Sequence, residues 1–407
     1  MTATATARRV PPMVDESVLS QIWKVSTAKN EIFDQSRARY GDAFGMNINR
    51  GKFYFLAHPD QVKEVFTASP EVLHAGKGNE ILATALGEHS VLLLDGSEHM
   101  RQRKLLLPSF HGEKLEAQTG AMERISEEVV ASIPRGESFH MRETSQKIAL
   151  EVILEIVLGT ASTGEQHDRL GKATRELLEW IGKGYRLALS SVFGPRSRPI
   201  KRMYKPALAP LDQGLYELIA ERRQATGLED RHDILSMLLL ARDEDGQPMT
   251  DLEIRDELVT LIVAGHETTA TALAWAFERL TRVPGGTERL HEEAVAGDGE
   301  FARWVSQEAL RLRPVLDFVL RRVMEPIEIG GYQFGEGDVL APSIYLVHRR
   351  EDVVDDRVHG LVVVRVRLGV EEVVHRAAQL LDAVLDDAQR DPEGGDDFLN
   401  SDLRMGK

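Results

Sequence analysis

Residues 264–269 read AGHETT and lie in the middle of an almost unbroken helical pattern. The pattern begins at Thr250 and Glu253, a capping box in which each side chain satisfies a backbone N–H of the other residue. Only Gly265 interrupts it before about Leu280, so we predict a helix of roughly 30 residues and about 45 Å. The section 258–264 is almost wholly apolar, which predicts burial on all sides.

The AGHETT residues are poor choices for a buried helix. Glycine costs about 1 kcal/mol relative to alanine in a helix interior, and adjacent threonines are also poor helix formers. A buried Glu267 needs a partner or a proton. The run therefore indicates a locally opened helix, in which a hydroxyl replaces a backbone hydrogen bond. The alternative is tight packing against a neighbour at Gly265, with threonine hydroxyls bonded to the preceding turn.

Two further motifs carry charge. Glu308 and Arg311 stand three residues apart in a helical pattern and can form a charge-assisted pair. His99 and Arg103 are four residues apart, share a helix face and could hold one anion together. Taken singly, an ordinary exposed pair worth under about 1 kcal/mol is the commoner interpretation of each.

The composition limits the class of protein. The 407 residues include 42% hydrophobic and 28% charged residues, which is typical of a globular protein. A formal charge of -15 argues against a nucleic-acid partner. Residues 1–9 lack the apolar core of a signal peptide, and no run reaches about 18 apolar residues. We expect a cytoplasmic protein without a membrane anchor.

Periodicity predicts a mainly α fold with a small β region. Helical patterns dominate from Gly112 to Glu278, and earlier helices are expected over Ser17–Tyr40 and Pro59–Thr67. Another helical face is expected within Ile148–Leu158. The expected short strands are Phe44–Asn47, Phe53–Ala57, Phe318–Val323, Ile327–Ile329 and Val339–Pro342.

The order and spacing of the three motifs resemble the cytochrome P-450 superfamily of bacterial haem-thiolate monooxygenases. The stretches Asp233–Leu239 and Ala341–Arg350 also resemble the segments that flank that family's central and Glu-x-x-Arg helices. The resemblance covers about residues 12–353. It implies the cytochrome P-450 fold, a haem cofactor, and NAD(P)H-driven monooxygenation (hydroxylation) of a small hydrophobic organic substrate. Electrons would come through a ferredoxin- or reductase-type partner.

The resemblance also assigns roles to residues on the haem's distal side. Ala264 and Gly265 would lie over the distal face, where glycine leaves room for dioxygen. Glu267 and Thr268 would relay protons, a general-acid role that needs a carboxylate and a hydroxyl near water. The region between about residues 71 and 90 would line the substrate pocket.

Other residues would hold the cofactor and the fold around it. His99, Arg103 and Arg321 would bind the haem propionates. Glu308 and Arg311 would form a buried structural pair behind the haem.

The resemblance ends near Val353. Residues 353–367 read VVDDRVHGLVVVRVR, without the family's Phe- and Gly-rich ligand loop, and the whole chain contains no cysteine. No metal ligand is therefore assigned. We expect a P-450-like domain over 1–353 and a divergent segment over 354–407, with an amphipathic helix at 371–388 and a disordered acidic end.

The missing cysteine leaves three hypotheses. A reading-frame shift or internal deletion near Val353 would leave a monooxygenase family member with impaired activity, because the axial thiolate promotes O–O cleavage. A haem-free accessory protein would instead bind and activate a partner enzyme such as a glycosyltransferase. Histidine-ligated haem is the third, with His348, His359 or His375 as ligand, although a solvated histidine is the commoner interpretation of each. The intact distal and propionate residues favour the first.

Overall fold

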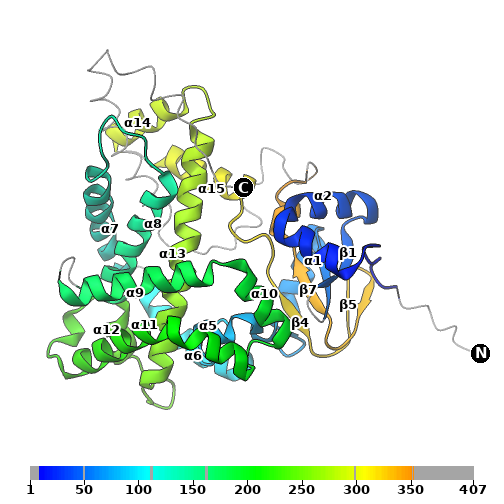
Figure 1. The fold of residues 1–407 in the computed structure, drawn as a ribbon, viewed down its shortest axis with the longest axis horizontal. Helices are drawn as coiled ribbons and strands as arrows, with labels where there is room; N and C mark the ends of the chain where they lie inside the picture. Colours follow the sequence, from blue (N-terminus) through cyan, green and yellow to red (C-terminus); the bar gives the residue numbers. More distant parts are fainter. Residues whose placement is uncertain are drawn as a thin grey trace, which may run out of the picture.

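The central helix α13 (Asp251–Leu280) has the predicted bounds. Its capping box forms: the Glu253 N–H donates to Thr250 Oγ1 at 3.2 Å, and the Thr250 N–H donates to Glu253 Oε2 at 2.7 Å. The helix passes between the other helices from one end of the helical region to the other (Figure 1). It is continuous at AGHETT, so the predicted local opening is wrong.

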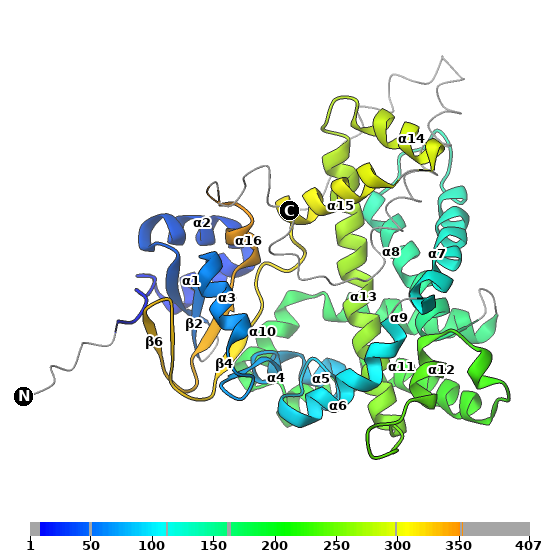
Figure 2. The same cartoon turned by 180° about the vertical axis from the view of Figure 1, so that it is seen from behind.

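The computed structural model describes residues 9–48, 51–110, 113–160, 164–297, 299–350 and 352. The predicted mainly α fold with a small β region is confirmed. Helices α7 to α15 gather around α13, while the strands lie with α1 and α2 on the other side (Figures 1 and 2). The predicted segment 354–407, its amphipathic helix and its disordered end lie outside the described residues.

The N-terminal helix predicted over Ser17–Tyr40 is two helices, α1 (Val18–Thr27) and α2 (Lys29–Tyr40). The backbone leaves the helical region at Ala28, with φ −144° and ψ 43°. The break lets both helices pack against strand β1 and against each other. Alanine favours helix, so the sequence carries no local signal for this break.

A five-stranded sheet joins the two ends of the described chain. Its order is β1-β2-β7-β4-β3, with β2 and β7 parallel. Strand β4 is shorter than predicted because Phe318 leaves the ladder and packs its ring edge-on against Phe33 and Phe55. The strands are β1 (Ala43–Ile48), β2 (Gly51–Leu56), β3 (Leu73–His74), β4 (Arg321–Val323) and β7 (Val339–Pro342).

A separate hairpin pairs β5 (Ile327–Ile329) with β6 (Tyr332–Phe334). Its turn places Gly330 and Gly331 at φ +57° and +76°, which non-glycine residues rarely adopt. The predicted strands at Ile327–Ile329 and Val339–Pro342 are confirmed, whereas β6 was not predicted.

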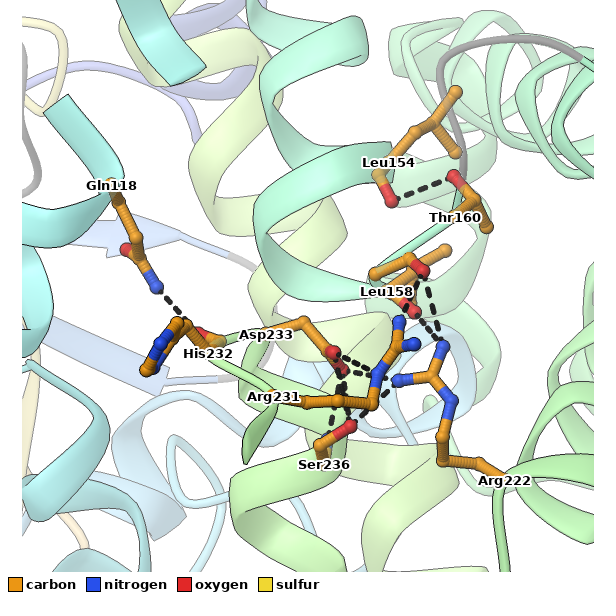
Figure 3. A network of polar contacts seen from close by, with 10 residues as sticks. Gln118, Leu154, Leu158, Thr160, Arg222, Arg231, His232, Asp233 and Ser236 are labelled. Carbon is orange, nitrogen blue, oxygen red and sulfur yellow. Dashed lines mark hydrogen bonds and ion pairs between the residues drawn. The ribbon is translucent and has the colours of Figure 1, made fainter. Parts of the chain in front are cut away.

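Helix α8 (Met141–Val152) packs along α13 and continues into the π-helical turn η3 (Ile153–Val157). Two residues after this turn, the Arg222 and Arg231 guanidinium groups donate to the Gly159 carbonyl at 3.1 and 2.9 Å. Both also pair with Asp233 (Figure 3). This buried network joins three helical segments at one point.

The remaining helices surround these elements. The helix predicted over Pro59–Thr67 is confirmed as α3. The others are α4 (Ala75–Gly78), η1 (Glu80–Leu82), α5 (Ala83–Leu86), α6 (Gly96–Leu106), η2 (Leu107–Phe110), α7 (Glu113–Ala131), α9 (Glu165–Ile181), α10 (Gly184–Phe193), α11 (Arg198–Gln224), η4 (Leu228–Asp230), α12 (Ile234–Leu240), α14 (Gly286–Ala296), α15 (Glu300–Leu312) and α16 (Ile344–Val347).

Candidate functional site

One face of α13 is only half buried, although the helix crosses the interior. Leu261, Ala264, Gly265 and Thr268 have intermediate exposure, and their spacing places them on one side of the helix. Full burial predicted for 258–264 therefore holds for Leu258, Val259 and Ile262 but not for this face. Ala264, Gly265 and Thr268 of the AGHETT motif border accessible space, whereas His266 is buried.

Crowding does not explain the glycine in this motif. A Cβ added to Gly265 would lie 3.5 Å from Ile153 Cδ1, which is ordinary van der Waals contact. The alternative of tight packing at Gly265 is therefore wrong. The predicted bonding of a threonine hydroxyl to the preceding turn is correct. Thr268 Oγ1 donates to the Ala264 carbonyl at 2.5 Å and stabilises the turn beside Gly265.

Glu267 points toward α8, away from the half-buried face. It accepts a hydrogen bond from Gln146 Nε2 at 2.8 Å and pairs with Arg142 Nη2 at 3.3 Å. His266 Nδ1 lies 3.4 Å from Glu267 Oε1. Contact with His266, followed by Gln146 and Arg142, lowers the pKa of Glu267 to about 2 against the effect of burial. The carboxylate is thus ionised at neutral pH and reaches solvent.

The pairing of Glu267 with α8 was not predicted from the sequence. Gln146 and Arg142 lie more than a hundred residues earlier in the chain. Their i, i+4 spacing indicates a shared helix face, but it does not reveal which helix that face contacts. Within the described residues, no hydrogen bond joins Glu267 to Thr268.

The structure brings together the three residues predicted to bind the haem propionates. His99 and Arg103 project from α6, and Arg321 projects from β4. Burial makes the largest contribution to lowering the pKa of His99. The guanidinium groups of Arg103 and Arg321 lower this pKa further, whereas Asp95 raises it. Burial also lowers the pKa of Arg321, whose guanidinium carbon lies 5.3 Å from the Phe66 ring centroid. Arg103 is exposed and Arg321 is half-buried, and these two guanidinium groups supply the positive charge that an oxyanion needs, while the imidazole of His99 lies beside them.

Glu308 and Arg311 form the predicted pair as a two-pronged contact, with nitrogen–oxygen distances of 2.7 and 2.5 Å. Arg311 Nη1 also donates to the His348 carbonyl at 3.0 Å. The prediction that the pair is buried is wrong for the described residues, because the Glu308 side chain is 54% exposed. The buried side of α15 carries Ala302, Ser306 and Ala309 instead, with α13 and α14 as its helix neighbours.

The region expected to line a substrate pocket ends against α13. The Val91 N–H donates to Glu257 Oε1 at 2.8 Å, and Thr260 Oγ1 donates to Ser90 Oγ at 2.7 Å. One residue earlier, the His89 N–H donates to Asp256 Oδ2 at 3.0 Å. These successive contacts fix the loop before α6 on the first half of α13.

The residues of this chain fit the carboxylates and the distal side of a haem, but they do not provide the thiolate ligand of its iron. The cations Arg103 and Arg321, with His99 beside them, suit two carboxylates, and the open face of α13 leaves room beside Gly265. A thiolate ligand is absent from the entire chain. Of the alternative histidines, His348 ends α16, whereas His359 and His375 lie outside the described residues.

The described residues contain no group of three or more His, Asp or Glu side chains placed to hold a metal ion. They also contain no helix with the length and apolar character needed to cross a membrane.

Comparisons with known proteins agree with this arrangement. The cytochrome P-450 family model matches residues 17–356. Putative cytochrome P-450 135B1 of Mycobacterium tuberculosis is 38% identical over 325 residues, covering 78% of this chain and 68% of that protein. Putative cytochrome P-450 138 of Mycobacterium bovis is 33% identical over 357 residues, covering 85% and 78%.

A solved structure shares the fold. The retinoic acid-bound cyanobacterial CYP120A1 superposes with a TM-score of 0.72 at 20% identity, covering 94% of this chain and 92% of that one. The fold and these motifs therefore define the class of protein with the cytochrome P-450 fold. The chain belongs to the cytochrome P-450 family.

Proposed function

We propose that this chain derives from an NAD(P)H-dependent monooxygenase that hydroxylates a small hydrophobic organic substrate, and that its own oxygenation is impaired. The supporting observation is the combination of a cation group at Arg103 and Arg321, with His99 beside it, and a chain that has no cysteine. The proposal places the protein in the cytoplasm, with a ferredoxin- or reductase-type electron donor.

The chain's residues would contribute binding and proton exchange. Haem supplies the iron chemistry of this family, which an axial thiolate promotes. His99, Arg103 and Arg321 would bind its carboxylates, and Ala264 and Gly265 would border its distal side. No oxygen-activation step follows for this chain, because the thiolate is missing.

Glu267 and Thr268 would have separate parts in proton movement. Glu267 is ionised beside Arg142 and Gln146, so at neutral pH it would accept hydrogen bonds from water and orient it, and it would not itself hold a proton. Thr268 carries its hydroxyl on the half-buried face. Because no hydrogen bond joins the two in the described residues, water would have to connect them.

The first experiment is the absorption spectrum of the full chain expressed with excess haem, before and after reduction under carbon monoxide. We expect no thiolate-type Soret band. A thiolate-type band would overturn the proposed impairment. A colourless protein that copurifies with a stable partner would replace it with the accessory-protein hypothesis, and a six-coordinate imidazole-type spectrum would replace it with the histidine-ligated one.

Haem titration of variants tests the cation group separately. Arg103→Gln and Arg321→Gln should each weaken haem binding about tenfold, the cost of one charge-assisted hydrogen bond. Arg303→Gln, which removes an exposed charge from α15, is the control and should bind as the wild type does. Equal binding by all four proteins would contradict the assigned role.

The coding DNA tests the origin of the divergent segment. We expect a cysteine codon within a Phe- and Gly-rich stretch in one of the other two reading frames after codon 352. Its absence from both frames would exclude a frame shift.

A further inference from the structure

A concave pocket lies away from the candidate haem site. It is formed by the end of α6, η2, η4 and α12, and its volume is about 650 Å³. That volume falls within the range of roughly 300–1,000 Å³ that holds small ligands. The apolar part of its lining includes Leu105, Pro108, Met237 and Leu240. Leu240 is 44% exposed, so this apolar lining is open to an incoming molecule.

The charged part of the lining is basic. Lys104, Arg231, His232 and Arg242 border the pocket, with Glu229 as the acidic residue among the lining side chains. The protein as a whole carries a formal charge of -15. A basic concave patch on such an acidic protein attracts anions locally.

Arg231 is held in place with part of its guanidinium unused. Its Nε donates to Asp233 Oδ2 at 2.8 Å, and its Nη2 donates to the Gly159 carbonyl at 2.9 Å (Figure 3). Asp233 is fixed in turn by Arg222 at 2.7 Å. Among the described residues, the Nη1 group of Arg231 has no acceptor. The donor is therefore preorganised by the same network that closes η3.

Arg242 and His232 add further available donors. Arg242 Nη1 donates to the Leu239 and Ala241 carbonyls at 3.0 and 2.7 Å, which anchors the side chain at the end of α12. Its Nε and Nη2 groups have no acceptor in the described part of the chain. The His232 carbonyl accepts from Gln118 at 3.0 Å, and no described residue bonds to its ring.

We propose that this pocket binds a small organic anion, a carboxylate or a phosphate carried on an apolar body. Anchored guanidinium groups suit the planar or tetrahedral oxyanion, and the apolar lining suits the body. The inference does not depend on haem, because the pocket contains none of the residues assigned to haem. A concave, partly apolar surface of this size favours a small molecule over the flat, acidic surface of a protein partner.

The test is calorimetric titration of the full-length protein with laurate and with dodecyl phosphate. Dodecanol supplies the same apolar body without charge, and inorganic phosphate supplies the charge without the body. We expect both amphipathic anions to bind at least about tenfold more tightly than dodecanol or inorganic phosphate. Equal binding of inorganic phosphate or of dodecanol would overturn the proposal.

Variants locate the binding. Arg242→Gln should weaken laurate binding about tenfold, the loss of one charge-assisted contact. Leu240→Glu should abolish it, because the exposed position tolerates a carboxylate that repels the ligand. Lys172→Gln on α9 removes an equal charge at an exposed site and should leave binding unchanged.

Circular dichroism of each variant verifies its fold. Unchanged affinity in both pocket variants would place the anion elsewhere, for instance beside α13, and would overturn the proposal. Loss of binding in the Lys172 variant as well would show a non-specific charge effect and overturn it equally.

Discussion

Glu257 is a fully buried carboxyl group on α13 that the proposed function does not use. One oxygen accepts from the Val91 N–H at 2.8 Å, while the other has no partner among the described residues. Burial raises the pKa of Glu257 to about 8, with smaller contributions from Asp256 and Glu253, against the hydrogen bond from Val91. At neutral pH the group therefore keeps its proton.

This proton makes the free energy of unfolding depend on pH. The unfolded chain releases it near pH 4.5 and the folded protein near pH 8, so stability falls as pH rises between these values. The gap corresponds to roughly 4 to 5 kcal/mol. Glu257→Gln should lack this loss and should be more stable than the wild type at pH 8. Urea unfolding at pH 5, 6.5 and 8 measures it, with exposed Glu71→Gln as control. Parallel pH profiles for Glu257→Gln and the wild type would contradict the assignment.

A second single-residue change, Gly265→Ala, should raise the free energy of unfolding. The new methyl group meets only Ile153 at ordinary contact distance, and alanine is better than glycine in a helix by about 0.5–1 kcal/mol. Gly120→Ala on α7, where the methyl group meets nothing, should give a similar gain. Urea unfolding compares them. A lower unfolding free energy for Gly265→Ala together with a higher one for Gly120→Ala would show that Gly265 is needed for packing.

At the scale of elements, the end of η3 depends on one backbone position. Gly159 has φ +64°, and a Cβ there would lie 2.3 Å from Asp233 Cγ. The glycine thus lets Arg222 and Arg231 reach its carbonyl while Asp233 pairs with both. Periodicity predicted a helix here, but the π-helical turn and its network depend on partners far along the chain.

Gly159→Ala should cost more than about 2 kcal/mol of unfolding free energy, because backbone strain and displacement of Asp233 add. Gly227→Ala provides the matched control. Its φ is +71°, but its nearest atom is 3.6 Å away, so it bears strain alone, about 1–2 kcal/mol. Equal losses for the two variants in urea unfolding would mean that the Asp233 network tolerates displacement.

Sequence reasoning located the elements whose signals are local. The capping box at Thr250 defined the start of α13, and the strand patterns located β5 and β7. It failed where a distant partner decides the outcome. The break at Ala28, the direction of Glu267 toward α8 and the exposure of Glu308 each depend on packing between elements. The group of His99, Arg103 and Arg321 was found because the family resemblance supplied the missing spatial information.

At the scale of the whole molecule, β7 connects strands from both ends of the described chain. It pairs with β2 on one side and β4 on the other. Leu340 is fully buried in the apolar cluster that contains Tyr54, Leu73 and Phe334. The sheet therefore depends on a core assembled from segments that are remote in sequence.

Leu340→Ala should reduce the unfolding free energy by about 2–5 kcal/mol, the usual cost of a cavity in a well-packed core. Leu316→Ala, at a position 53% exposed, should change it by less than about 1 kcal/mol. Urea unfolding followed by tryptophan fluorescence and circular dichroism measures both. A loss below 1 kcal/mol for Leu340→Ala would show that the sheet contributes little to global stability.

The parallel pairing of β2 with β7 also has a consequence during synthesis. Strand β2 leaves the ribosome early, whereas β7 is made only near the end of the described chain. At roughly 5–20 residues per second, the interval is on the order of tens of seconds. Throughout it the hairpin of β1 and β2 presents an open strand edge, which promotes aggregation. The nascent chain therefore passes through a long period in which chaperones would protect that edge.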